Sequence, residues 1–175
     1  MRVIVVTGMP GAGKEEFLAA GRATGVPFVR MGDLVREFYS GRSPVDRTLS
    51  MGEFAGRERE RQGADIWARR ALERMRDGPN IVDGCRSMDE VRAFRGLGDT
   101  VIVAVHAPPP VRYERLVKRA REDMPHSVEE FEARDARELS WGVGEVIALS
   151  DLMIDNSGPL EDFRRRSAGL VGSLR

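Results

Sequence analysis

A glycine-rich segment with one lysine follows the first apolar run of the chain. Residues 8–14 read GMPGAGK, so Gly8, Gly13 and Lys14 satisfy the pattern G-x-x-x-x-G-K between the runs RVIVVT and EEFLAAGRA. Glycines allow backbone angles that turn successive N–H groups toward one anion, and a helix N-terminus and a lysine add positive charge. The spacing therefore predicts a loop that binds the polyphosphate of a nucleotide, the alternative being a glycine-rich turn without a ligand.

The residue after Lys14 departs from this pattern. The motif has Ser or Thr there, whose hydroxyl binds Mg²⁺, but this chain has Glu15. A carboxylate is a good Mg²⁺ ligand, so Glu15 is a predicted metal ligand; the alternative is that Glu15 and Glu16 only complement the helix dipole. We expect ATP and Mg²⁺ as cofactors, with nucleotide contacts from Gly8, Met9, Pro10, Gly11, Ala12, Gly13, Lys14, Glu15 and Glu16.

A second carboxylate ends another short apolar run. Residues 80–82 read NIV and are followed by Asp83 and Gly84. In folds with a phosphate loop, the strand that ends in such a carboxylate normally lies beside the strand that feeds the loop. Asp83 is therefore a predicted catalytic residue and metal ligand, which holds the Mg²⁺ shell or orients the acceptor oxygen. The alternative is that Asp83 only caps the next turn through Gly84.

The elements that position these residues follow from the hydrophobic pattern. Residues 3–6 and 101–105 are apolar on both faces, as central strands of a parallel sheet are. Weaker runs at residues 27–30, 80–82 and 152–154 fit beside them, and a helical pattern follows each run. Repeated strand and helix predict right-handed crossovers and a three-layer α/β/α sandwich with a five-stranded parallel sheet.

Local chemistry marks several helix starts. Asp33 precedes the helical run LVREFY, and Ser87 and Ser127 each have a glutamate three residues later, which predicts capping boxes with Glu90 and Glu130. Polar stretches at residues 41–65 and 119–140 are too hydrophilic for a core. They predict helical excursions over the carboxyl edge of the sheet, where loops can close on a ligand.

Composition excludes several classes of function. A chain of 175 residues suits one domain, and its 28 acidic and 28 basic residues balance, so no global field favours nucleic acid or an anionic membrane. Cys85 is the only cysteine, and no apolar run is long enough to cross a bilayer. We expect a cytoplasmic protein that is a monomer or homodimer, with no nucleic-acid or membrane partner.

Several segments resemble a known family. GMPGAGK, MGDLVR at 31–36 and DGCRS at 83–87 resemble the phosphate loop, the GDLLR-like segment and the DG-x-x-R segment of adenylate kinases and related nucleoside monophosphate kinases. VHAPPPVRYERL, RDARELSWGVGEVIALSD and MIDNSG resemble an archaeal adenylate-kinase-related family that borders on dephospho-CoA kinases. The resemblance covers nearly the whole chain. It implies the P-loop NTP hydrolase fold of nucleotide kinases, with an acceptor-binding excursion at about 32–75 and a lid at about 119–140.

The resemblance also implies roles for arginines on the acceptor side. Arg36 and Arg86 match the arginines that hold the acceptor's phosphate, and Arg59 is expected to join them. Guanidinium groups bind a dianionic phosphate through two hydrogen bonds, although arginines are common on the surface of this chain. Asp33 is a further predicted acceptor contact or only a helix cap, and Arg42 and Asp65 are further candidates.

The lid implied by the resemblance carries arginines that neutralise the transferred phosphoryl group. We expect Arg119 and Arg137 to be catalytic, and Arg121 and Arg134 to bind substrate. The alternative is that Glu130, Arg134 and Glu138, at four-residue spacing, form a solvated ion-pair face.

The turn after the last strand supplies Asn156 and Gly158. By resemblance this turn lies against the adenine base, and the alternative is a purely conformational use of both residues.

Three functions agree with these residues. The first is a kinase that transfers the γ-phosphoryl group of ATP to a nucleoside monophosphate or nucleotide-like acceptor, in the manner of adenylate kinases. The second is a dephospho-CoA kinase-like activity. The third is a regulatory switch that binds or hydrolyses ATP without a small-molecule acceptor, which the unusual Glu15 favours. Dependence of ADP formation on an acceptor separates the kinases from the switch.

Overall fold

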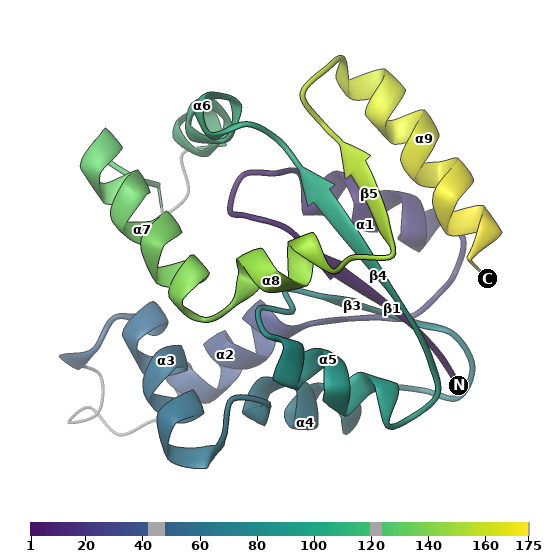
Figure 1. Cartoon of the computed structure of the whole chain (residues 1–175), viewed down its shortest axis with the longest axis horizontal. Helices are drawn as coiled ribbons and strands as arrows, with labels where there is room; N and C mark the ends of the chain where they lie inside the picture. The colour runs from purple at the N-terminus through teal and green to yellow at the C-terminus, as the bar shows by residue number, and fades with distance from the viewer. Residues whose placement is uncertain (42–47, 120–123, 175) are drawn as a thin grey trace.

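Five parallel strands form the central sheet, in the order β2-β3-β1-β4-β5 (Figure 1). The computed structural model describes residues 1–41, 48–119 and 124–174. Each of the five predicted strands is present, which confirms the predicted fold class. The strands are β1 (Arg2–Thr7), β2 (Phe28–Arg30), β3 (Asn80–Asp83), β4 (Asp99–His106) and β5 (Leu152–Asp155).

Helices connect the strands and cover both faces of the sheet. Figure 1 shows α1 and α9 together on one side, and α4, α5 and α8 on the other. The helices α6 and α7 lie beyond the carboxyl ends of the strands. The described helices are α1 (Lys14–Ala23), α2 (Met31–Ser40), α3 (Met51–Gln62), α4 (Ile66–Leu72), α5 (Met88–Arg95), α6 (Pro109–Arg119), α7 (Val128–Ser140), α8 (Val143–Ala148) and α9 (Leu160–Ser173).

The strand β1 explains why the sheet is buried on both faces. Val3 and Val5 pack into a core with α2, α4, α5 and α8, whereas Ile4 and Val6 point to the opposite core with α1 and α9. All four side chains are fully buried. Successive side chains of a strand alternate between faces, so a continuous apolar run is required only where helices cover both. This burial fixes the end of β1, from which the phosphate loop emerges.

Two predicted helix starts are confirmed in part and one is wrong. Ser87 and Ser127 cap α5 and α7 by accepting the N–H groups of Glu90 and Glu130. The glutamate carboxylates reach one residue further back than a capping box requires, and each accepts the N–H of the residue before the serine. Asp33 does not begin its helix: α2 begins at Met31, directly after β2, so Asp33 lies in the first turn, where its charge complements the helix dipole.

A full capping box that sequence reasoning missed begins α3. The Ser50 side chain accepts the N–H of Glu53, and the Glu53 carboxylate accepts the N–H of Ser50 at 2.7 Å. This start lies in the polar stretch at residues 41–65 and helps α3 to form despite its hydrophilic sequence.

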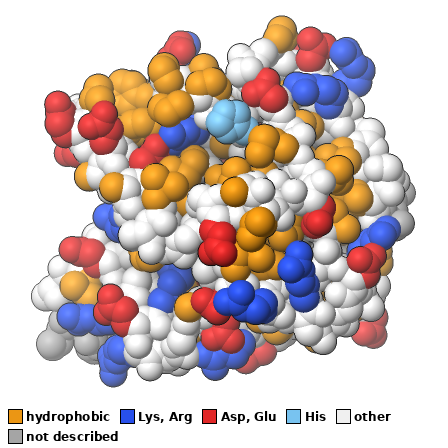
Figure 2. Space-filling model, in the orientation of Figure 1, with side chains coloured by type: hydrophobic (Ala, Val, Ile, Leu, Met, Phe, Trp, Pro, Cys, Tyr) orange, Lys and Arg blue, Asp and Glu red, His pale blue; other side chains and the backbone are white. Residues whose placement is uncertain are grey.

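Exposed hydrophobic side chains gather on the face that carries α7, α8 and β5 (Figure 2). Leu139, Leu149 and Met153 are each more than half exposed there. Within the described ranges, no helix combines the length and the apolar composition needed to cross a bilayer. The expected oligomeric state, monomer or homodimer, stays a prediction.

Candidate functional site

The carboxyl ends of β1 and β3 open into a cavity of about 370 Å³. Register places Val6 beside Asp83, so the start of the phosphate loop and the predicted carboxylate lie on neighbouring strands, as the sequence predicts. Helices α6 and α7 contribute the remaining wall. The cavity is lined by Gly8, Pro10, Gly11, Gly13, Lys14, Glu15, Glu16, Asp83, Gly84, Cys85, Arg86, Arg115, Leu116, Arg119, Arg134 and Glu138.

The loop between β1 and α1 has the conformation of an anion cradle. Gly8, Gly11 and Gly13 all have positive φ, of 145°, 81° and 102°. A Cβ at Gly8 would collide with the Val105 carbonyl, so the loop also needs glycine to approach β4. The Lys14 ammonium lies across the loop and donates to the Gly8 carbonyl at 2.6 Å. This geometry supports the predicted phosphate site.

Lys14 and Asp83 both line the cavity, and the charge of each reduces the energetic cost of burying the other. Burial lowers the pKa of the Lys14 ammonium, and the Asp83 carboxylate counteracts part of that shift. Burial likewise raises the pKa of Asp83, against the attraction of Lys14 and Arg30. Both side chains are only half-buried and line the cavity, so these opposite charges are partly desolvated and interact more strongly than they would in bulk water.

Asp83 also has a polar atom that suits a metal ion. Its Oδ1 is buried and accepts no hydrogen bond from the residues that the structure describes. Buried carboxylate oxygens are normally satisfied, so this one is available to a cation or to its water shell. No cluster of three or more metal-ligating side chains occurs in the described part of the chain. Asp83 therefore fits an Mg²⁺ ion that takes its other ligands from phosphate oxygens and water, as Mg²⁺ commonly does.

Glu15, the other predicted metal ligand, has a partner. The Arg30 guanidinium, at the end of β2, donates to the Glu15 carboxylate. Arg30 itself stacks against Phe28, with its guanidinium carbon 5.7 Å from the ring centroid. Glu15 would have to leave Arg30 to enter a metal shell, so this arrangement favours the non-metal interpretation of Glu15. Glu16 pairs with Arg164 of α9 and ties α1 to the last helix.

Asn156 supports the phosphate loop from behind. Its side-chain amide donates to the Ala12 carbonyl at 2.8 Å, and a Cβ at Gly13 would collide with the same amide group. Asn156 is buried, at 2 % exposure, whereas Gly158 has open space around it. The structure thus brings Asn156 to the loop's backbone, a contact that the resemblance to adenine-binding turns did not predict.

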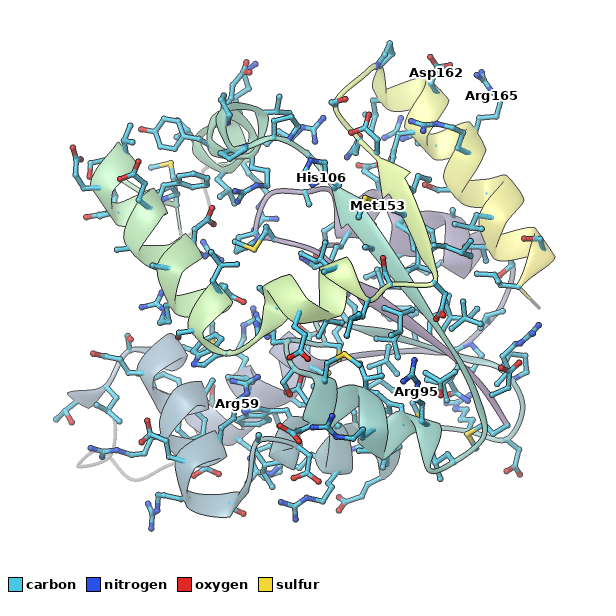
Figure 3. The ribbon with its side chains drawn as sticks, in the orientation of Figure 1. Arg59, Arg95, His106, Met153, Asp162 and Arg165 are labelled. Atoms are coloured by element: carbon cyan, nitrogen blue, oxygen red, sulfur yellow. The ribbon has the colours of Figure 1, made fainter. Side chains whose placement is uncertain are left out.

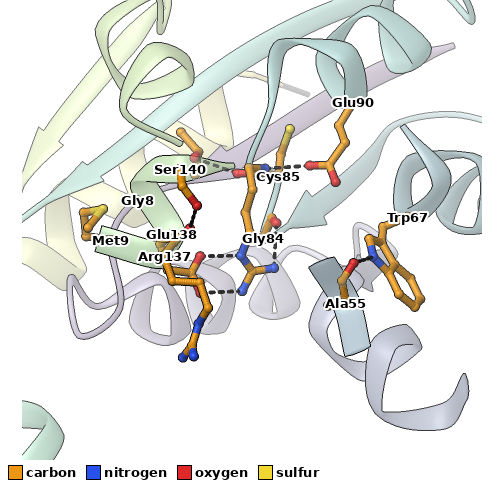
Figure 4. A network of polar contacts seen from close by, with 12 residues as sticks. Gly8, Met9, Ala55, Trp67, Gly84, Cys85, Glu90, Arg137, Glu138 and Ser140 are labelled. Carbon is orange, nitrogen blue, oxygen red and sulfur yellow. Dashed lines mark hydrogen bonds and ion pairs between the residues drawn. The ribbon is translucent and has the colours of Figure 1, made fainter. Parts of the chain in front are cut away.

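Arg86 is brought into the cavity as predicted, and its guanidinium is already engaged. Two of its nitrogens donate to the Glu138 carboxylate of α7, and Nη1 donates to the Gly84 carbonyl at 3.3 Å. Figure 4 labels Glu138 and Gly84 at this place. Burial alone would lower the pKa of this guanidinium, but Glu138 keeps it above its ordinary value. Burial also disfavours the Glu138 carboxylate, yet Arg86 lowers its pKa overall. The alternative of a solvated ion-pair face formed by Glu130, Arg134 and Glu138 is therefore wrong for Glu138, which is buried.

Arg59 of α3 is buried and does not line the cavity. Its Nη2 donates to Glu90 at 3.1 Å, and its guanidinium carbon lies 4.8 Å from the Trp141 ring centroid. Figure 3 shows Arg59 on α3 pointing into the protein. Arg59 and Arg86 also share two neighbours, because Arg86 lies over the same Trp141 ring at 5.6 Å and donates its backbone N–H to Glu90.

The other predicted acceptor residues lie away from the cavity lining. Arg36 and Asp33 are exposed and pair with each other at 2.7 Å, three residues apart on α2. Asp65 pairs with Arg69 at 3.2 Å. Arg42 and Arg121 fall outside the described residues.

The arginines expected in a lid divide into two groups. Arg119, at the end of α6, and Arg134, on α7, line the cavity. Arg137 does not line it: its guanidinium packs against Gly52 of α3, 3.3 Å from the position that a Cβ would take there. Side chains three residues apart on a helix point in directions that differ by part of a turn. Arg134 and Arg137 therefore reach different neighbours.

Three lining or supporting residues were missed by the sequence reasoning. Arg30 ends β2 at the same edge of the sheet as Asp83. It could have been predicted, because side chains at the carboxyl ends of parallel strands meet at one edge. Arg115 donates to the Asn156 carbonyl at 2.8 Å and holds α6 against the last turn, with no sequence signal among so many arginines. Glu138 was read as part of an exposed charge pattern.

Comparison with known proteins agrees with this geometry. The family model of an AAA domain matches residues 4–137. A UPF0200 protein of Thermoplasma volcanium is 44% identical over 171 residues, covering 97% of this chain and 96% of that protein. Another, from Thermococcus onnurineus, is 42% identical over 180 residues, with 98% and 97% covered.

Solved kinases share the fold at low sequence identity. A gluconokinase from Sinorhizobium meliloti has a TM-score of 0.59 at 19% identity, covering 98% of this chain and 92% of that one. A shikimate kinase from Acinetobacter baumannii has a TM-score of 0.63 at 14% identity, with 98% and 93% covered. These likenesses support the predicted P-loop kinase fold. The match to the family model and the identity to the two UPF0200 relatives lead to one assignment: the chain belongs to the AAA domain family and to the UPF0200 proteins.

Proposed function

We propose that this protein is a kinase that transfers the γ-phosphoryl group of ATP to a small acceptor bearing an oxyanion. The observation that carries the proposal is the convergence of three groups on one cavity: the phosphate loop with Lys14, the carboxylate of Asp83, and the guanidinium of Arg86. A nucleotide-dependent switch needs the phosphate loop and a carboxylate. It does not need a second anion-binding group such as the Arg86 guanidinium beside them. The whole chain would act as one cytoplasmic domain, with α2 to α4 on the acceptor side and α7 as the lid.

Each residue has a distinct task in this scheme. The N–H groups of the loop hold the β- and γ-phosphates, and Lys14 leaves the Gly8 carbonyl to neutralise the developing charge. Asp83 would hold the shell of an Mg²⁺ ion, which would supply charge neutralisation between the phosphates, or orient the attacking oxygen of the acceptor. Arg119 and Arg134 approach from the lid side. Arg86 binds the acceptor's anionic group so that the attacking oxygen, which is a hydroxyl or an oxygen of the acceptor's phosphate, lies in line with the phosphoryl group.

The anionic group of the acceptor is open to two chemical classes. The resemblance to nucleoside monophosphate kinases and to dephospho-CoA kinases favours a phosphate. A carboxylate is the second candidate, because Arg86 already binds the carboxylate of Glu138 through two nitrogens. The solved neighbours named gluconokinase and shikimate kinase act on acceptors of that second class. A guanidinium fork accommodates either group.

Acceptor dependence is the direct test of this function. ADP formation from ATP and Mg²⁺ is measured with nucleoside monophosphates, dephospho-CoA, gluconate and shikimate, each added alone. We expect ADP release to rise at least tenfold with one acceptor class, since a positioned nucleophile, either a hydroxyl or an oxygen of the acceptor's phosphate, competes with water. Slow ATP loss that is indifferent to every acceptor would favour the regulatory switch instead.

A matched pair of lid variants tests the role of the cavity arginines. Arg119→Ala is expected to lower kcat by about a hundredfold and to leave ATP affinity within about threefold, because a donor aimed at the transferred group acts mainly in the transition state. Arg137→Ala should change kcat far less, since Arg137 packs against Gly52. Arg165→Ala, on the exposed surface of α9 (Figure 3), is the control. A larger loss for Arg137 than for Arg119 would reverse the assignment.

A further inference from the structure

The subsite that the proposed function gives to the acceptor is filled by a side chain of the protein itself. The Glu138 carboxylate takes two hydrogen bonds from Arg86, which are the two that a planar oxyanion of a ligand would use (Figure 4). Only 7 % of Glu138 is exposed, and it belongs to the lining of the same cavity as Lys14. The buried Glu138 carboxylate therefore neutralises Arg86 and also occupies the position that an oxyanion of a ligand would take.

The helix that carries Glu138 is held to the rest of the protein by few apolar contacts. Phe131 is its one buried apolar side chain within the described structure, and it packs on Tyr113 of α6 with ring centroids 5.5 Å apart. Two ion pairs also hold the helix: Arg112 pairs with Asp135, and Arg86 pairs with Glu138. Near its C-terminal end, Arg137 packs against Gly52 of α3. Loss of the Arg86 pair would therefore remove the ion pair that holds Glu138 over the cavity.

A ligand oxyanion competes with Glu138 for Arg86, and a triphosphate bound in the cavity would favour the ligand. Bound triphosphate would place negative charge near Glu138, because Lys14 and Glu138 already interact through the same cavity. A ligand dianion attracts Arg86 more strongly than the single charge of a glutamate at equal distance. The displaced Glu138 would regain water, which lowers the cost of the exchange.

We propose that Glu138 is a built-in competitor for the acceptor's anion subsite, so that α7 releases Arg86 only when an oxyanion of the acceptor takes its place. This inference rests on the proposed function for the identity of the ligand, but the exchange itself needs neither ATP nor turnover. Glu138 is a positioning residue here, because it acts through Arg86 and not on the reacting atoms.

Trp141 gives the exchange an optical signal. It follows α7 directly, and the Arg86 guanidinium carbon lies 5.6 Å from its ring centroid. The only other tryptophan of the chain, Trp67, is fully buried against Phe54 and Phe38. Movement of α7 away from Arg86 changes the charge next to the Trp141 indole and leaves Trp67 unaffected.

The test is the affinity of the full-length protein for inorganic phosphate and, separately, for gluconate, measured by calorimetry. Glu138→Asp keeps the charge but shortens the side chain, so it is expected to bind one of the probes several-fold more tightly than wild type. Glu138→Gln should tighten binding by about tenfold, which is about 1.4 kcal/mol. Glu132→Gln, the same charge change at an exposed position of α7, is the control and should stay within about twofold. Which probe responds distinguishes a phosphate-bearing from a carboxylate-bearing acceptor.

Two comparisons separate direct competition from a general effect of charge. In an Arg86→Ala background the gain from either Glu138 variant should disappear, because the two residues act as one pair. Saturation with the responding probe should shift the fluorescence of wild type and leave that of Trp141→Phe unchanged. If Glu138→Asp binds both probes as wild type does, or if the gain survives in Arg86→Ala, the proposal is wrong. A failure of acceptor-dependent ADP formation alone would count against the proposed kinase and not against this exchange.

Discussion

Lys14→Ala is expected to lower kcat for phosphoryl transfer by about 10²–10³-fold. In the described structure the ammonium lies on the Gly8 carbonyl, in a loop whose glycines line the cavity. Water cannot replace a full positive charge held at this position, so the loss falls mainly on the transition state, where negative charge is spread over the phosphoryl oxygens. The measurement is steady-state ADP formation under the acceptor conditions that give the highest rate, with ATP affinity determined separately.

The chain provides its own control for this substitution. Lys118 is the only other lysine, and it is exposed and pairs with Glu114 at 2.6 Å. Lys118→Ala removes the same charge from the molecule and should leave kcat within about twofold, since surface ion pairs contribute little. Equal losses in both variants would mean that net charge, and not the position of Lys14 in the loop, determines the rate. An unchanged rate in Lys14→Ala would remove the phosphate loop from the mechanism.

Asp83→Asn is expected to reduce kcat by about 10²–10⁴-fold, the range associated with loss of a positioned acid or base. The amide keeps the shape of the side chain but loses the charge that holds a Mg²⁺ shell or orients the attacking oxygen of the acceptor. If Asp83 acts through the metal, the variant should also need more Mg²⁺ for half-maximal rate; if it orients the attacking oxygen, the Mg²⁺ requirement should stay the same. A variant with wild-type kcat at saturating Mg²⁺ would exclude both roles.

The same variant has an opposite effect on stability, with a defined pH dependence. The folded-state pKa of Asp83 lies above its ordinary value of 3.8 because of burial. Between 3.8 and that raised pKa the folded protein keeps a proton that the unfolded chain has lost, so wild-type stability falls as pH rises through this window. Asp83→Asn does not titrate there. Its free energy of unfolding relative to wild type should therefore increase across the window and stay constant above it.

Urea denaturation at a series of pH values measures this difference. Asp99→Asn is a suitable control, because Asp99 lies on β4 but is exposed and pairs with Arg2 at 2.8 Å. We expect no comparable increase for the control. A stability difference for Asp83→Asn that does not change with pH would contradict the partly desolvated charge that the structure places at the end of β3.

Much of the fold was predictable because its signals are local. The continuous apolar run of β1 is required wherever helices cover both faces of a sheet, and the glycines after it are required by positive φ and by the approach to Val105. Asp33 shows the limit of this reasoning. Its residue type suits a helix cap, but the chain turns from β2 into α2 without a connecting loop, so that the helix begins before Asp33.

Only the site residues whose positions follow from the order of the strands could be predicted from the sequence. Asp83 ends β3, and Lys14 follows the loop that leaves the neighbouring strand β1, so both reach the cavity. Arg36 and Arg137 match or neighbour functional motifs, but their helices direct them to the surface and to α3. The chain has 28 basic residues, nearly all arginine, so residue type alone does not distinguish an arginine of the cavity from one of the surface.

The sequence by itself determined the phosphate loop, the parallel sheet and the carboxylate beside them, because each depends on residues that are close in the chain or on strands of fixed order. The tertiary structure alone decided the pairs Arg86 with Glu138 and Arg30 with Glu15, and the support of the loop by Asn156. These contacts join segments 15 to 144 residues apart. The packing of the helices over the sheet determines which of these residues come into contact. The residue type of a charged side chain does not indicate which opposite charge it will pair with.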